Sequence, residues 1–201
     1  QDPDYLDLTN NGPSLDDLGG FTIFRYTQQS GSSDKSGGGN WYNWRMPYSG
    51  FDYSIGAISE CHDDRISYAD GEKELYYLAT VETKSQVAVF ELSDPGTRRD
   101  AYGAPTIDPW QASPAQGLDK KRYLKSIKLY SRAEYAIYCV NTNLARPIKT
   151  VHFDYDYSAW KGAGANAPPN SYANEGKLTL KRVWTEYNGT VPAKIAPYQF
   201  D

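Results

Sequence analysis

Apolar and polar residues alternate along much of this chain with the period of two that is typical of β-strands. The pattern is clearest from Val151 to Tyr157, where aromatic and apolar residues alternate with His152, Asp154 and Asp156. We therefore expect a strand there with one buried face and one solvated face. Similar patterns predict strands over residues 21–27, 41–45, 53–58, 65–69, 123–130, 135–141 and 177–187.

A β-hairpin is predicted between residues 75–81 and 87–92, because both segments are rich in apolar residues and flank a short polar turn. Residues 135–141 are expected to pair with 123–130 across another short turn. A further turn is expected at residues 70–71, where Asp is followed by Gly. These pairings make the predicted sheet antiparallel.

Helical periodicity is weak, so the predicted fold class is all-β, an antiparallel β-sandwich with long irregular loops that could consist of two packed β subdomains. The 18 tyrosines and 5 tryptophans among 201 residues agree, because aromatic side chains suit a pleated, half-buried surface. The expected segments are an acidic, turn-rich entry over 1–20, a first β subdomain over 21–93, an irregular Pro-rich connection over 94–118 and a second β subdomain over 119–201.

The charge balance narrows the range of expected binding partners. A net charge of -4 argues against nucleic acid, since phosphate contacts need clustered Lys and Arg. No stretch approaches the roughly 20 apolar residues that cross a bilayer, so no membrane-spanning segment is expected.

A calcium loop is one candidate site near the start of the chain. Oxygen-bearing side chains at alternate positions, followed by a glycine, suit a hard cation and a sharp turn. The candidate ligands are Asp7, Thr9, Asn11, Asp16 and Asp17. Leu18 stands where an EF-hand has its bidentate Glu, and a turn-rich linker without metal gives the same pattern. Ca²⁺ therefore remains a candidate cofactor beside the metal-free alternative.

A cluster of aromatic residues is a second candidate site. Exposed aromatic rings can stack on sugars, while neighbouring polar side chains bind hydroxyl groups; the same residues also build β cores and protein interfaces. The candidate ligand-binding residues are Trp41, Tyr42, Trp44, Arg45 and Tyr48.

Two cysteines and two histidines complete the candidate chemistry. Cys61 and Cys139 could form one disulfide, but Cys139 lies in the predicted strand 135–141 and is expected to be a buried free thiol. His62 and His152 each have carboxylates nearby and could act as a base in a polysaccharide lyase or hydrolase. The alternatives are a solvated loop around His62 and the wet face of a strand around His152.

Six stretches carry a resemblance to known proteins: residues 11–20, 44–48, 73–78, 147–158, 176–180 and 197–200. With them, the chain resembles segments of very large, mostly uncharacterised extracellular proteins of the Bacteroidetes phylum. It is also loosely similar to β-rich regions of Rhs/YD-repeat proteins and of Tc insecticidal toxin B components. The resemblance brings no catalytic residues with it.

The resemblance implies a building block of a large surface or secreted assembly, stacked on neighbouring domains or subunits through edge strands and aromatic faces. The start at Gln1 and the strand-like end at Asp201 also favour a segment of a longer polypeptide. The expected function is a non-catalytic structural or adhesive module. A carbohydrate-binding module and a polysaccharide lyase or hydrolase are the alternatives.

Overall fold

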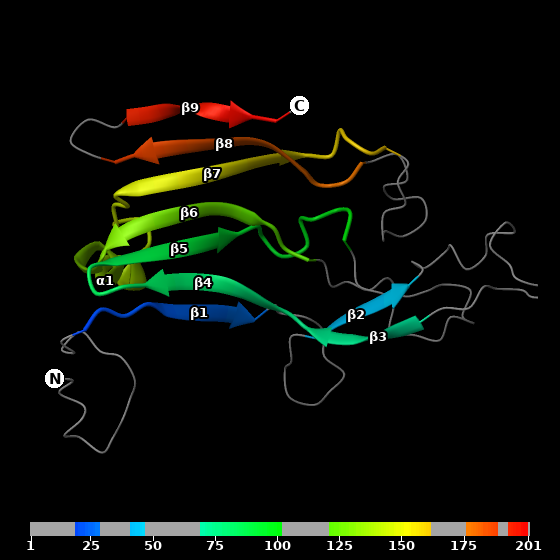
Figure 1. Cartoon of the computed structure of the whole chain (residues 1–201), viewed down its shortest axis with the longest axis horizontal. Helices are drawn as coiled ribbons and strands as arrows, with labels where there is room; N and C mark the ends of the chain where they lie inside the picture. Colours follow the sequence, from blue (N-terminus) through cyan, green and yellow to red (C-terminus); the bar gives the residue numbers. More distant parts are fainter. Residues whose placement is uncertain are drawn as a thin grey trace, which may run out of the picture.

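The described part of the chain is built mainly of β-strands. The computed structural model describes residues 19–28, 41–46, 69–101, 121–161, 176–188 and 193–200. Figure 1 shows an extended sheet with one short helix against it and a separate pair of strands. The predicted all-β, antiparallel fold class is confirmed.

The larger sheet has seven strands in the order β1-β4-β5-β6-β7-β8-β9, with every neighbouring pair antiparallel. The strands are β1 Ile23–Gln28, β4 Tyr76–Glu82, β5 Gln86–Leu92, β6 Leu124–Ser131, β7 Lys149–Asp156, β8 Thr179–Tyr187 and β9 Ala193–Gln199. The predicted hairpin is confirmed as β4 and β5, and the predicted strands at β1, β6, β7 and β8 are also present. Because β5 pairs with β6, the two predicted subdomains contribute to one sheet.

Strands β2 (Trp41–Met46) and β3 (Ala69–Glu74) form a second, two-stranded sheet. The turn predicted at residues 70–71 is wrong, because β3 runs straight through it. Gly71 lies opposite Trp44, and a Cβ at Gly71 would come within 3.1 Å of the indole ring. The glycine at this position makes room for a tryptophan. The strand predicted over residues 53–58 lies outside the described residues, and so do residues 65–68 of the strand predicted over 65–69.

Residues 135–140 belong to helix α1 (Arg132–Val140) and Asn141 caps its end, so the strand predicted over 135–141 is wrong. Ser131 caps the helix: its side-chain oxygen accepts a hydrogen bond from the backbone N–H of Glu134 at 3.2 Å. This Ser-x-x-Glu spacing is the capping box that marks a helix start. Helix α1 then connects β6 to β7, which pair side by side.

A small apolar core lies between α1 and the sheet. Val87 and Tyr130 are 0% and 1% exposed, and Val89 is 6% exposed. The residues that pack against these three are Tyr135, Tyr138 and Ala145. The helix therefore covers one end of the central strands β5 and β6 (Figure 1).

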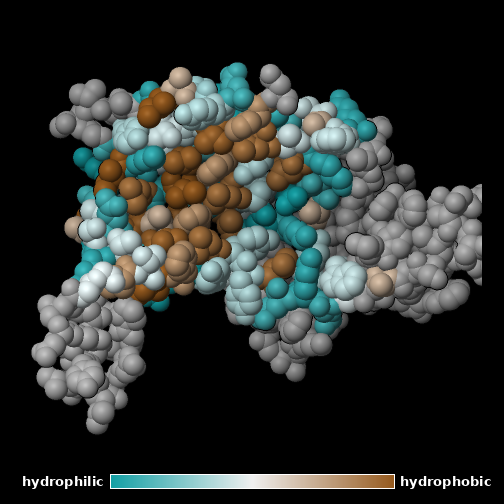
Figure 2. Space-filling view, viewed as in Figure 1, coloured by the Kyte–Doolittle hydropathy of each residue, from teal (hydrophilic) through white to brown (hydrophobic). Residues whose placement is uncertain are grey.

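Strand register divides the seven-stranded sheet into two faces, because directly opposed residues of neighbouring strands point the same way. The polar face, which carries α1, includes Thr80, Glu82, Glu91, Ser126, Lys128, Thr150, His152, Asp154, Arg182, Trp184 and Glu186. The apolar face includes Phe24, Val81, Ala88, Phe90, Ile127, Leu129, Val151, Phe153, Val183, Ile195 and Tyr198. Figure 2 shows apolar residues gathered over the middle of the sheet on the side turned to the viewer.

The outer strand β9 contains an irregularity. Between the paired positions Tyr198 and Ile195, the two residues Ala196 and Pro197 stand against Trp184 of β8. Proline has no N–H to donate and is tolerated at bulges and sheet edges. Pro197 makes this edge a poor template for a further strand.

Gly176 occupies a position that admits no side chain. Its N–H donates to the carbonyl oxygen of Tyr157 at 2.9 Å, and a Cβ at this position would overlap the carbonyl oxygen of Ala159. We expect Gly176→Ala to lower the free energy of unfolding by about 1–3 kcal/mol, as overpacking does. Urea denaturation measures this loss in the free energy of unfolding. Gly19→Ala, where the added methyl meets open space, is the control, and equal losses in both variants would contradict the close approach.

Candidate functional site

The densest group of polar and aromatic side chains lies on the polar face, across β7, β8 and β9. The His152 imidazole stacks on the Trp184 indole with ring centres 3.8 Å apart and planes 12° from parallel. The Lys194 ammonium lies 5.4 Å from the centre of the same indole. The register creates this group, since His152 is directly opposite Trp184. The indole is thus engaged by both an imidazole and a cation.

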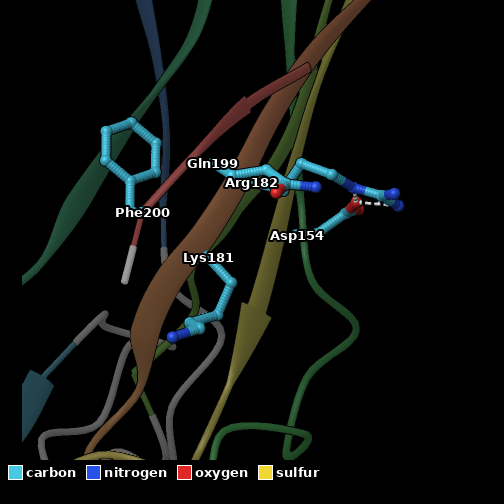
Figure 3. A pocket seen from close by; sticks show the side chains of 5 residues that line it. All are labelled: Asp154, Lys181, Arg182, Gln199 and Phe200. Atoms are coloured by element: carbon cyan, nitrogen blue, oxygen red, sulfur yellow. Dashed lines mark hydrogen bonds and ion pairs between the residues drawn. The ribbon is translucent and has the colours of Figure 1, made fainter. Parts of the chain in front are cut away.

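Asp154 is the anionic centre of the same group. Its Oδ2 accepts hydrogen bonds from Arg182 Nε at 2.5 Å and from Trp184 Nε1 at 3.2 Å. Figure 3 shows Asp154 and Arg182 pointing toward one another beside a pocket of 410 Å³. The other residues that line this pocket are Lys181, Gln199 and Phe200. The carboxylate and guanidinium neutralise each other, so the pocket presents a mixed polar and aromatic wall with little net charge at this ion pair.

His152 is one of the histidines considered as a catalytic base. Its Nε2 is buried and has no hydrogen-bond partner within the part of the chain that the structure describes. The nearest carboxylate oxygen, Glu186 Oε2, is 3.6 Å away, beyond ordinary hydrogen-bond length. A general base must reach the proton that it abstracts. The catalytic role of His152 remains a prediction from residue type, while the observed contacts are those of a packed aromatic pair.

The predicted aromatic site lies partly on β2. Tyr42 is 3% exposed, and the ammonium groups of Lys73 and Lys121 lie 5.4 and 5.1 Å from its ring centre. Trp44 is half-buried against Gly71. The Tyr42 ring is therefore buried inside the protein beside two cations, whereas sugar stacking needs an open ring face. Trp41 and Arg45 belong to the same strand, but their side chains, like all of Tyr48, lie outside the described residues.

The predicted calcium ligands Asp7, Thr9, Asn11, Asp16 and Asp17 also lie outside the described residues, as do Cys61 and His62. Within the described ranges, no group of three or more His, Cys, Asp or Glu side chains is placed to hold a metal ion. The calcium loop and the disulfide stay predictions.

Cys139 is exposed on α1, which corrects the expectation of a buried residue in a strand. The physical reason is its place in the helix. Tyr135 and Tyr138 pack against the core, whereas Cys139 is the next-to-last residue of α1 and is exposed there. The sequence could have shown this through the capping box at Ser131.

Two carboxylates on the polar face, the buried Glu82 and the half-buried Glu91, are held by cations. Glu82 accepts hydrogen bonds from Arg25 at 2.7 Å and Arg132 at 3.0 Å, and Glu91 accepts one from Lys128 at 2.6 Å. Burial by itself would raise the pKa of each carboxyl. The hydrogen bonds outweigh burial, so the pKa of Glu82 and that of Glu91 lie below the ordinary value of 4.5.

Acid is therefore expected to destabilise the fold. The carboxyls of Glu82 and Glu91 have a lower pKa in the folded chain than in the unfolded chain, so the unfolded chain binds more protons at low pH. Their contribution is complete above the ordinary value of 4.5 and is lost as the pH falls through the lower folded values. Urea denaturation in steps from pH 7 to acid measures the effect. A free energy of unfolding that stays constant below pH 4.5 would contradict the ion pairs.

The apolar face is the surface that the sequence did not reveal. Phe24, Ile195 and Tyr198 are 56%, 50% and 74% exposed, and none of the apolar-face residues named above is buried. The row Phe90, Ile127 and Val151 continues the surface across β5, β6 and β7. Extended apolar surfaces of this kind mark contact sites. The alternation in single strands was visible in the sequence, but the register that aligns all strands on one face was not.

Comparison with family models, with curated proteins and with solved structures gave no match. Within the described residues, no helix has the length and apolar character needed to cross a membrane. The two faces of the sheet are therefore the features that bear on function.

Proposed function

We propose that this chain is a non-catalytic structural or adhesive β module of a large secreted or cell-surface bacterial assembly. In that assembly, the apolar face is buried against another β domain. The single observation that carries the proposal is the apolar face itself, which lies opposite α1 and whose residues are all partly or largely exposed.

The two faces support this division of roles. The polar face already has its helix, its ion pairs and its stacked rings, so its side chains have partners within the chain. The apolar face presents exposed aromatic and aliphatic side chains, and a sheet face of this kind gains stability when another sheet packs on it. A module of this kind is held in its assembly by the burial of apolar surface, and this role requires no catalytic group.

Oxidative footprinting of the native product tests the proposal with a matched pair of residues. Tyr198 on the apolar face and Trp160 outside the sheet are both 74% exposed in the isolated chain. In the native assembly we expect hydroxyl radicals to modify Trp160 but not Tyr198, relative to the isolated chain. Equal modification of Tyr198 in both samples would contradict a buried apolar face. Cleavage of a polysaccharide by the isolated chain would contradict the non-catalytic role.

A further inference from the structure

We infer that the occupant of the apolar face is a second copy of this chain, packed face to face. The inference rests on the proposed function, because it names the partner for the same surface.

The centre of the apolar face is complementary to an uncharged, apolar and extended partner. Its central row, Phe90, Ile127 and Val151, is apolar and continues through Thr185 to Ile195. The next row contains Phe153, Val183 and Tyr198, and the charged Lys149 stands beside Leu129 on the other side of the central row. A charged peptide or a polyanion would leave its charges desolvated here without partners. The apolar face of another copy matches these demands, and an isologous contact needs only a self-complementary patch. Two sheet faces that pack in this way form the two layers of a β-sandwich, about 10 Å apart.

The area of the face is sufficient for a stable pair. The sheet has seven strands, which at about 4.8 Å spacing span roughly 29 Å. Over about six residues of each strand, the length is roughly 20 Å, so each copy offers on the order of 600 Å². The two copies together would bury about 1,200 Å² or more, which reaches the range of specific protein interfaces.

The geometry of the contact favours a closed pair over an open chain of copies. A face-to-face contact about a twofold axis uses the same patch on both copies and leaves no second patch free. Strand addition at the edge strand β9 is the competing contact, and Pro197 disfavours it because it removes a donor from that strand. The expected species is a dimer.

Sedimentation of the 201-residue chain over a range of concentrations tests the inference. We expect a reversible dimer with twice the monomer mass of 22.6 kDa. Tyr198→Glu places a charge on the apolar face, in an edge strand where the side chain is 74% exposed and folding is little affected. This variant should weaken dimerisation at least about tenfold, because the charge would be buried without a partner. Leu144→Glu, at a residue that is 67% exposed outside the sheet, is the matched control and should leave dimerisation unchanged.

Three results would overturn the inference. A chain that remains monomeric at its highest soluble concentration excludes a second copy as the occupant. A monomer that also fails to bind the apolar dye bis-ANS would show that the face is covered by another segment of the same chain. A dimer that Tyr198→Glu and Leu144→Glu affect equally would place the contact elsewhere. If the chain is monomeric but Tyr198 is protected in the native assembly, the proposed function stands with a different β domain as partner.

Discussion

Replacement of Tyr130 by alanine is expected to lower the free energy of unfolding by about 3–5 kcal/mol, the usual cost of removing a buried aromatic ring. Tyr130 is 1% exposed and lies beneath α1, where its ring centre is 5.2 Å from that of Tyr138. Among the described residues, the buried cluster under α1 consists of Tyr130, Val87 and Val89. Its largest member therefore supports both the helix and the middle of the sheet. Urea denaturation followed by circular dichroism measures the loss.

Two further variants isolate the contribution of the ring. Tyr26→Ala removes a tyrosine that is 61% exposed on β1 and is expected to cost less than about 1 kcal/mol. Tyr130→Phe keeps the buried ring and is expected to retain most of the stability. Burial raises the pKa of the Tyr130 hydroxyl to about 12, and absorbance of the tyrosinate during alkaline titration reports whether that burial is intact. If Tyr130→Ala costs no more than Tyr26→Ala, α1 does not cover a core at this place.

The strands were predictable wherever local pattern and tertiary contacts agree. Alternation in β7 and the polar turn between β4 and β5 were enough to place those elements. At α1 the aromatic and β-branched residues from Tyr135 to Val140 favour a strand, whereas the Ser131 side chain caps a helix by accepting from the Glu134 N–H. The helix forms because it covers the small core. At Gly71 the glycine serves the packing of Trp44, which no local turn pattern reveals.

The candidate surfaces depended on pairing between strands that are distant in sequence. His152 and Asp154 were visible as polar positions of one strand, but their contacts with Trp184 and Arg182 follow from the register of β7 with β8. A shift of one residue would turn these side chains to the opposite face. The same dependence explains why the apolar face was missed: it can be recognised only when the six pairings between the seven strands are known.

Replacement of Glu82 by alanine is the second large effect that we expect, a loss of about 3 kcal/mol, because it breaks a buried, hydrogen-bonded charge network. Glu82 is 5% exposed, and its carboxylate joins Arg25 of β1 to Arg132, the first residue of α1. Arg132 also donates to the carbonyl oxygen of Thr83 at 2.8 Å, so the network anchors the start of the helix to the β4–β5 turn. Removing the carboxylate leaves the half-buried Arg132 guanidinium without its counter-ion.

Glu82→Gln separates charge from shape in this network. The amide keeps the size of the side chain but cannot become charged, so part of the stability at neutral pH is lost together with part of its acid sensitivity. Asp94→Ala, which removes an exposed carboxylate, is the control and should change the free energy of unfolding by less than about 0.5 kcal/mol. Urea denaturation at pH 7 and at acid pH measures all three variants. A Glu82→Gln chain that loses as much stability in acid as the unaltered protein would show that Glu82 is not held ionised by Arg25 and Arg132, and that α1 is anchored by its apolar contacts alone.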